Sequence, residues 1–354
     1  MDFWAGELGD NYIKGIKHNN VMDSVYNYLH KNEPKINYPF KNLFLDNGAF
    51  SILKNNYTHK KKKIKINLAS IIDIQEKLKP KYTVPFDYPF NPQMAIKDME
   101  KNWEKTINNI DYWKDCTNLN LIPALHGWSK SSLEKNIHIL YKKDFDYIAL
   151  GSAFILKEKF KGFFGDRQPH KNIYEAFLYF ASLAKKLDIY IHIFGIGSSP
   201  LTFHLANFCE IKSSDSSGYR RKAAYGKIVL PQTGERYAGN GSAKFGFNWK
   251  KGFKFDNIFT EEEKRKLREC KCPECKKISR HAYRRWKHLC SDWKIRAIHN
   301  KWVIEQEEII SNKLIQQGWD VYEGFIDKMM ENSRPFKSLW NFIKNTKKIY
   351  FRKI

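Results

Sequence analysis

The sequence predicts an α/β fold, a TIM (β/α)8 barrel with an inserted zinc-binding subdomain and a helical C-terminal end. Three observations carry this prediction. Short β-rich runs alternate with helical segments from residue 3 to about residue 216, which is the pattern of a repeated βα unit. Polar or glycine-containing residues follow these runs, as they do at the catalytic mouth of a barrel. Three cysteines lie close together after the barrel pattern ends.

Seven apolar runs are the predicted strands, and Ala243–Phe247 is a weak candidate for the eighth. The seven are Phe3–Ala5, Asn42–Asp46, Tyr82–Asp87, Leu119–Leu125, Tyr147–Gly151, Ile189–Gly195 and Cys209–Asp215. Helices are predicted between them at Leu68–Leu78, Pro92–Trp113, Ser131–Leu140, Ile173–Leu187 and Pro200–Phe208. A doubly wound open sheet is the alternative, because periodicity does not show whether a sheet closes.

The chain is predicted to fall into three regions. Residues 1–258 form the catalytic barrel, residues 259–305 the zinc-binding subdomain, and residues 306–354 helices that pack on the barrel. The pattern of strands and helices ends near Gly226, and a hairpin with several glycines follows. Thr260–Arg268 is predicted to be a helix, because a Thr N-cap precedes three glutamates in the first turn.

The 354-residue chain carries a large excess of basic side chains. Lys and Arg number 62 against 38 Asp and Glu, which gives a net charge of +24. Such an excess favours a polyanionic partner, although part of the Lys content accompanies many Asn and Ile residues, as in a low-GC genome. No run approaches the roughly 20 apolar residues that cross a bilayer, and the first residues begin no signal peptide. We therefore expect a cytoplasmic protein without membrane association.

Cys270, Cys272 and Cys275 form the sharpest local motif, and His299 follows 24 residues after the last of them. In a reducing compartment such clustering indicates a metal and not disulfides. Three thiolates and an imidazole can fill the four positions of a tetrahedral zinc ion, which would make the zinc structural. The spacing leaves the fourth ligand open, since His281, His288 and Cys290 compete with His299. Unligated cysteines on a surface turn are the alternative.

Three aspartates follow predicted strands, namely Asp46, Asp87 and Asp215. Carboxylates gathered at one mouth suit glycosidic-bond chemistry, in which one attacks the anomeric carbon and another moves a proton. Each aspartate taken alone could instead cap a helix or close a turn.

These motifs resemble the tRNA-guanine transglycosylase superfamily over roughly residues 40–305. The most specific parts are Asp46-Asn-Gly-Ala-Phe50, Phe194-Gly-Ile-Gly197, Asp215 through Arg221, and the cysteine cluster running into Ser279-Arg-His-Ala-Tyr283 and His299-Asn300. The resemblance implies a TIM barrel with a zinc subdomain. It also implies a pentosyltransferase that exchanges guanine for a 7-deazaguanine through a covalent link between enzyme and sugar.

By this resemblance Asp215 is the nucleophile, Asp46 is the general acid and base, and Asp87 reads the base. The family's last zinc ligand stands in a Glu-His-Asn context, so Ile298-His299-Asn300 supports His299 as the fourth ligand. The resemblance assigns base contacts to His126, Gly151, Phe194 and Gly195, and phosphate contacts to Arg220 and Arg221. A structural histidine is the alternative for His126, and a core aromatic is the alternative for Phe194.

The chain departs from the usual family motifs at the base-binding and strand-binding positions. It has Asp46-Asn-Gly-Ala-Phe-Ser51 for Asp-Ser-Gly-Gly-Phe-Gln, His126-Gly-Trp128 for Gln-Gly-Gly, and Asp215-Ser-Ser-Gly-Tyr-Arg-Arg221 for Asp-Cys-Val-x-Pro-Thr-Arg. The Ser214-Asp215-Ser216-Ser217 sequence and the Phe3-Trp4-Ala5-Gly6 start are most like the DpdA branch of bacteria and phages, which inserts 7-deazaguanines into DNA. The expected partners are therefore DNA and a free 7-deazaguanine such as preQ0, in a bacterial cell or a phage-infected host, with a homodimer possible.

Two other functions remain open. The first is a tRNA-guanine transglycosylase of the queuosine or archaeosine pathway, which would share the chemistry and differ in the polymer. The second belongs to another class, a non-catalytic nucleic-acid-binding subunit that keeps the barrel and the zinc as a scaffold. Intact Asp46 and Asp215 argue against the second, because a protein that only binds needs neither.

The net charge generates a prediction about nucleic-acid binding. If the basic side chains contact several phosphates and release their counterions, affinity for nucleic acid will fall about 10³-fold or more between 50 and 200 mM salt. Fluorescence anisotropy with a labelled oligonucleotide measures this dependence. A flat dependence on salt would show that the charge reflects genome composition alone.

Overall fold

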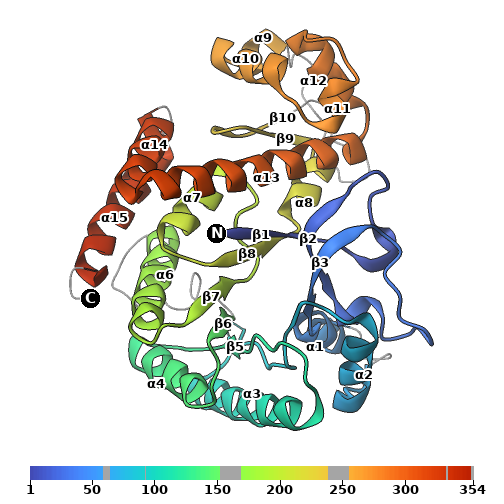
Figure 1. Cartoon of the computed structure of the whole chain (residues 1–354), viewed down its shortest axis with the longest axis vertical. Helices are drawn as coiled ribbons and strands as arrows, with labels where there is room; N and C mark the ends of the chain where they lie inside the picture. Colours follow the sequence, from blue (N-terminus) through green and yellow to red (C-terminus); the bar gives the residue numbers. More distant parts are fainter. Residues whose placement is uncertain (59–63, 92, 152–168, 238–254, 332–333, 352–354) are drawn as a thin grey trace.

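The computed structural model describes residues 1–58, 64–91, 93–151, 169–237, 255–331 and 334–351. Its centre is one sheet of eight parallel strands surrounded by helices (Figure 1). The strands are β1 (Asp2–Gly6), β2 (His18–Ser24), β3 (Phe40–Asp46), β4 (Tyr82–Thr83), β5 (Ala124–Leu125), β6 (Tyr147–Leu150), β7 (Tyr190–Ile193) and β8 (Ser213–Ser216).

The sheet closes on itself. β1 pairs with both β2 and β8, and the strands follow one another in the order β4-β3-β2-β1-β8-β7-β6-β5. A parallel bridge between Thr83 of β4 and Leu121, three residues before β5, joins the two ends of the sheet. On either side of it, the N–H of Thr83 donates to Asn120 O at 3.0 Å and the N–H of Ile122 donates to Thr83 O at 2.8 Å. The predicted barrel is therefore confirmed, and the open sheet is excluded.

The eighth strand is β2, which the sequence did not predict. Ala243–Phe247, the candidate for that place, lies outside the described residues. The sequence of β2, His-Asn-Asn-Val-Met-Asp-Ser, offers only two consecutive apolar residues and no alternation. Its two buried polar residues are His18 and Asp23, and other elements supply their partners. Asp23 accepts hydrogen bonds from the hydroxyls of Tyr28 and Tyr38 at 2.8 and 2.5 Å. Such partners come from tertiary structure and leave no local pattern.

Helices cover the outside of the barrel, and most lie where periodicity placed them. They are α1 (Ala49–Thr58), α2 (Leu68–Leu78), α3 (Ile96–Cys116), α4 (Lys130–Tyr141), α6 (Pro169–Lys186), α7 (Pro200–Phe208) and α8 (Gly218–Ala224). The bounds of α2 and α7 match the prediction. In α7, Ser199 caps the first turn through a capping box with Thr202, and Pro200 occupies the first helical position. The sequence did not predict α1 or α8.

The two faces of each strand have different neighbours, and this alternation positions the site. In β7, Ile191 and Ile193 pack outward into the main core with the surrounding helices. His192 instead faces inward, where its ring lies 4.8 Å from that of Phe44 in β3. Other inward-facing side chains from separate strands, including Trp4, form a core inside the barrel.

A smaller unit lies beyond the barrel, on the far side of a long helix (Figure 1). It contains the antiparallel hairpin β9 (Lys227–Leu230) and β10 (Gly234–Tyr237), with α9 (Phe255–Ile258), α10 (Glu261–Glu269), α11 (Pro273–Lys276) and α12 (Ala282–Ser291). The predicted capping of α10 is confirmed, since Thr260 forms a capping box with Glu263. Ile228 and Leu230 of the hairpin share a buried core with the three clustered cysteines.

The chain ends in three helices, α13 (Trp293–Gln317), α14 (Trp319–Glu331) and α15 (Arg334–Phe351). α13 runs between the barrel and the smaller unit, in contact with α8, β9 and α12. α15 packs along α6, and its Trp340 ring lies 4.6 Å from that of Phe208 in α7. Among the described residues, none of the helices combines the length and the apolar character that a bilayer crossing requires.

Candidate active site and metal centre

The three predicted aspartates lie at one end of the barrel. Asp46 is the last residue of β3, Asp87 follows β4, and Asp215 lies in β8. In a parallel barrel the carboxyl ends of all strands open at the same mouth, which is where TIM-barrel enzymes carry their catalytic groups. The charges of Asp87 and Asp215 both act on Asp46, whose pKa they raise.

Asp46 is a half-buried carboxyl group that is held on one side. Its Oδ2 accepts hydrogen bonds from the Gly48 N–H at 2.9 Å and from the Ser24 hydroxyl at 3.1 Å. Burial, followed by the charge of Asp87, raises the pKa of Asp46 from an ordinary 3.8 to about 7. A carboxyl group with this pKa is protonated about half the time at neutral pH, which suits a group that both gives and takes a proton.

Asp87 and His126 are brought together, as the sequence predicted for two base-reading residues. His126 Nε2 lies 2.7 Å from Asp87 Oδ2, and both residues are buried. Asn47 donates to the other carboxylate oxygen at 2.9 Å and to Pro85 O at 2.6 Å. Two neighbours therefore hold Asp87 in place. Each of its carboxylate oxygens can still accept a further hydrogen bond.

Gly151 lies against the ring of His126. A Cβ atom at position 151 would stand 2.4 Å from His126 Cε1. Only glycine therefore lets the end of β6 approach the imidazole so closely. The structure places Gly151 beside the Asp87–His126 pair, where its backbone borders the predicted base pocket.

Asp215 is oriented by the loop that follows β7. The Gly195 N–H donates to Asp215 Oδ1 at 2.9 Å, and Gly195 has a φ of +75°, a conformation that other residues rarely adopt. The sequence assigned Gly195 to the base, and the structure places its N–H on the predicted nucleophile. His192 Nε2 lies 3.4 Å from the same oxygen.

Two phenylalanines lie near the aspartates. Phe194 is half-buried against the inner core of the barrel, with its ring 4.8 Å from that of His192. Phe50, in the first turn of α1 four residues after Asp46, is 68% exposed. An exposed aromatic ring at the mouth offers a flat surface on which a planar base can stack.

The two predicted phosphate ligands are in different environments. Arg220 is buried, pairs with Glu7, and donates to Asn11 O at 2.6 Å. Its guanidinium therefore binds groups of the protein itself. Arg221, the next residue of α8, is exposed.

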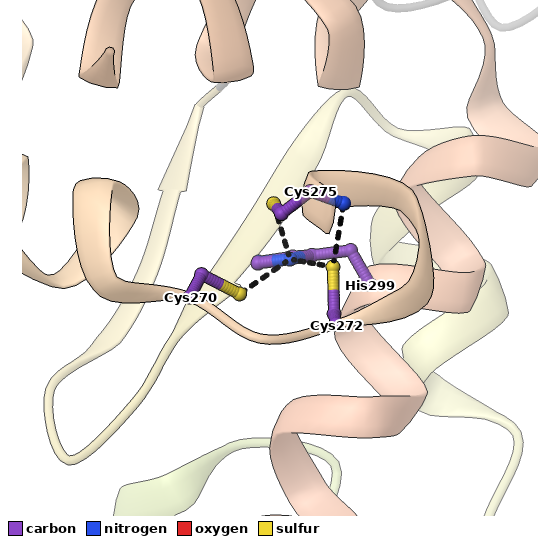
Figure 2. A group of neighbouring side chains, drawn as sticks. All are labelled: Cys270, Cys272, Cys275 and His299. Atoms are coloured by element: carbon purple, nitrogen blue, oxygen red, sulfur yellow. Dashed lines mark hydrogen bonds between the residues drawn. The ribbon is translucent and has the colours of Figure 1, made fainter. Parts of the chain in front are cut away.

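The metal centre gathers all four residues of the predicted zinc set. The ligand atoms of Cys270, Cys272, Cys275 and His299 lie within 4.8 Å of one another, and all four residues are buried. Figure 2 shows the three thiols arranged around the imidazole. His299 Nδ1 lies 3.3 Å from Cys272 Sγ and 3.7 Å from each of the other two sulfurs. None of the four is part of a disulfide.

The other nitrogen of His299 shows that the group suits a metal ion. His299 Nε2 lies 2.9 Å from Val229 O, a carbonyl that can only accept, so Nε2 carries the hydrogen. Nδ1 then has a free lone pair, which is directed at the sulfurs. A histidine whose second nitrogen donates to a carbonyl is the usual arrangement of a metal ligand.

The competing ligands lie elsewhere. His288 pairs with Glu274 at 3.1 Å, His281 precedes the first turn of α12, and Cys290 is half-buried outside the group. The structure therefore places His299, and not these residues, with the cysteines.

Sequence reasoning missed Asn47, His192 and Ser213. Asn47 belongs to the Asp46-Asn-Gly motif. Its amide directly follows a strand-end aspartate, and this position could have indicated a residue of the site. His192 lies two residues before Phe194, and side chains at this spacing on a strand point to the same face. Because Phe194 was expected at the mouth, His192 could have been expected to face the barrel interior. Ser213 gave no signal, because its place in the site comes from His192 of the neighbouring strand, whose Nδ1 lies 2.6 Å from Ser213 Oγ.

Comparison with protein families adds one finding. The family model described as Queuine tRNA-ribosyltransferase matches residues 37–333. The matched range holds the three aspartates and the four residues of the metal centre. No curated protein matches the chain.

The electrostatics of the mouth generate a prediction about Asp46. In carbon-13 NMR, the carboxyl resonance that disappears in Asp46→Asn is expected to titrate with a midpoint near pH 7. Asp87→Asn removes a neighbouring negative charge and should lower this midpoint by about one pH unit, and Asp215→Asn should lower it less. Asp73→Asn, an exposed change on α2, is the control that leaves it unchanged. A wild-type midpoint near 4 would contradict the geometry.

Proposed function

The chain belongs to the queuine tRNA-ribosyltransferase family and is therefore a guanine transglycosylase, a pentosyltransferase, and we propose that it replaces guanine in DNA with a 7-deazaguanine such as preQ0. The observation that carries the proposal is the meeting of Asp46, Asp87 and Asp215 at one mouth. In particular, Asp46 has a pKa of about 7 and Asp215 is oriented by Gly195.

In the proposed reaction, Asp215 attacks the anomeric carbon of the nucleotide. A bond forms between its carboxylate oxygen and C1′. The bond from C1′ to guanine breaks, and its electron pair leaves with the base. Protonated Asp46 donates a proton to that base. The incoming 7-deazaguanine then gives a ring N–H proton to the Asp46 carboxylate and attacks C1′, which releases Asp215. Because its pKa is about 7, Asp46 can hold either state at neutral pH.

Asp87, with His126 behind it, is the proposed reader of the base. A carboxylate accepts hydrogen bonds from the ring N–H and amino group of guanine, and a 7-deazaguanine offers the same donors. Gly151 contributes its backbone at the pocket wall, where a side chain would displace His126. Phe194 and exposed Phe50 would hold the base between aromatic surfaces.

The choice of DNA rests on the sequence that follows the nucleophile. Ser216, Ser217 and Gly218 replace the family's Cys-Val-x, and these changes alter contacts to the strand while leaving the carboxylate chemistry intact. To expose the anomeric carbon, a nucleotide in a duplex must be flipped out of the stack. We propose Arg221, with its exposed side chain, as the nearby phosphate contact, in preference to buried Arg220. tRNA is the alternative polymer.

We propose that the metal centre holds zinc. Three thiolates and one imidazole match the ligand preferences of this ion, and four protein ligands leave no position open for substrate. The zinc would supply structural cross-linking, joining α11 and the segment before it to α13.

This assignment predicts the composition and stability of the protein. Purified protein should contain about one zinc ion per chain by elemental analysis. Cys272→Ser should lose the ion and about 4 kcal/mol or more of unfolding free energy, because metal binding and folding of the unit are coupled. Cys116→Ser, an exposed cysteine outside the group, should change neither quantity. A folded, active protein without metal would refute the assignment.

The nucleophile and the polymer can be tested together. With the incoming base withheld, wild-type protein and a guanine-containing DNA oligonucleotide should give a slow-migrating covalent band on a denaturing gel. Asp215→Asn should abolish the band, because an amide is a poor nucleophile. Asp46→Asn should slow base exchange about 10²-fold or more while nucleic-acid binding persists.

The same experiment with tRNA decides between the two polymers. An adduct with tRNA alone would overturn the assignment to DNA and leave the chemistry standing. A band of unchanged intensity in Asp215→Asn would instead rule out the proposed mechanism. Asp73→Asn is the matched control, since it makes the same chemical change at an exposed position on α2.

A further inference from the structure

A chain of buried hydrogen bonds reaches Asp215 from inside the barrel. His192 Nε2 lies 3.4 Å from Asp215 Oδ1, and His192 Nδ1 lies 2.6 Å from Ser213 Oγ. Ser213 Oγ also bonds to the hydroxyl of Tyr147 in β6. His192 and Ser213 have no exposed surface, so bulk water does not compete for these positions.

With a neutral imidazole at His192, the chemistry of the four groups fixes the direction of each hydrogen bond. A carboxylate oxygen accepts, so the hydrogen between His192 and Asp215 belongs to Nε2. A neutral imidazole carries one ring hydrogen, and Nδ1 must therefore accept from the Ser213 hydroxyl. Ser213 Oγ in turn accepts from Tyr147. Burial raises the pKa of the Tyr147 phenol, which keeps this terminal donor protonated.

We propose that His192 is a positioning residue that, together with the Gly195 N–H, holds Asp215 Oδ1 and presents Oδ2 to the anomeric carbon. This inference rests on the proposed function. Both donors reach Oδ1, at 3.4 Å for His192 and 2.9 Å for Gly195. Among the residues that the structure places, no hydrogen bond is directed at Oδ2. The bond to C1′ therefore forms at Oδ2, and Oδ1 becomes the carbonyl oxygen of the resulting ester.

The Ser213–Tyr147 pair favours the neutral form of His192 that this arrangement requires. A neutral donor orients the carboxylate and leaves its negative charge available for attack. An imidazolium would form a charged pair with Asp215 and make it a weaker nucleophile. By donating to Nδ1, Ser213 favours the neutral Nε2–H form of His192, and Tyr147 fixes the Ser213 hydroxyl in the orientation that allows this.

The kinetic test compares two substitutions of His192. His192→Gln keeps an N–H donor near the position of Nε2, whereas His192→Leu removes it at similar volume. With a guanine-containing DNA oligonucleotide and no incoming base, adduct formation should slow about 30-fold or more in His192→Leu and less than about 5-fold in His192→Gln. The dissociation constant for the oligonucleotide should stay within about twofold of the wild type in both, because neither change touches the strand-binding surface.

Ser213→Ala adds a variant that leaves the histidine in place. It should slow adduct formation without weakening oligonucleotide binding, since Nδ1 loses its donor. If His192→Leu forms the adduct as fast as the wild type, the inference is overturned. It is also overturned by a His192→Gln protein as slow as His192→Leu when both melt like the wild type, because a donor at this position would then be irrelevant.

Nitrogen-15 NMR of histidine-labelled protein provides a readout that needs no turnover. The signals that disappear in His192→Gln belong to His192, and their shifts show which ring nitrogen carries the hydrogen. An Nε2–H form is expected. An Nδ1–H form would overturn the inference even if the wild type forms adducts. An Nε2–H form in a protein that forms no adduct with any guanine oligonucleotide would instead overturn the proposed function, and with it the role given to Oδ2.

Discussion

Two adjacent residues of α13 tie the metal centre to the barrel, and the rest of the structure depends on them. His299 directs Nδ1 at the cysteines, while Asn300 accepts from the Val229 N–H at 2.8 Å and donates to Tyr219 O and Lys227 O at 3.2 and 3.1 Å. Both side chains are fully buried, so each backbone partner left unpaired would cost about 1 to 3 kcal/mol. Because α8 begins three residues after Asp215, the helix that carries His299 also positions the segment after Asp215.

A second buried connection fixes the other side of that segment. Glu7, directly after β1, pairs with Arg220, accepts from the Tyr219 hydroxyl, and lies 3.3 Å from His18 Nε2. Burial lowers the pKa of His18 to about 3, so the charge pair here is Glu7 with Arg220. Breaking such a pair leaves one charge uncompensated in the interior, which is far costlier than losing a surface pair. This explains why Arg220, five residues after Asp215, points inward while the neighbouring Arg221 remains exposed.

The mouth of the barrel, in contrast, holds a carboxyl group whose environment lowers the stability of the fold at neutral pH. A carboxyl group whose pKa is raised in the folded state binds its proton more tightly there than in the unfolded chain, so stability falls as pH rises from about 4 to about 7 for Asp46. The backbone of the mouth at Asp46 is held by neighbouring strands, since β3 pairs with both β2 and β4. Catalytic sites commonly carry such a cost, since the groups that react must not be fully satisfied in the resting protein.

The sequence by itself determined the features that rest on local patterns. Alternating βα segments predicted the barrel, and they predicted the first and last residues of α2 and α7 correctly. The cysteine spacing predicted a metal site. The strand-end aspartates, with the resemblance built on them, predicted which residues meet at the mouth. Tertiary structure decided what depends on partners distant in the chain. It made polar His18–Ser24 a central strand, selected His299 over three rival ligands, and turned Arg220 inward to Glu7. It also placed His192 behind Asp215, 23 residues away. In these cases the deciding contacts join residues of separate elements, so local sequence patterns can at most suggest them.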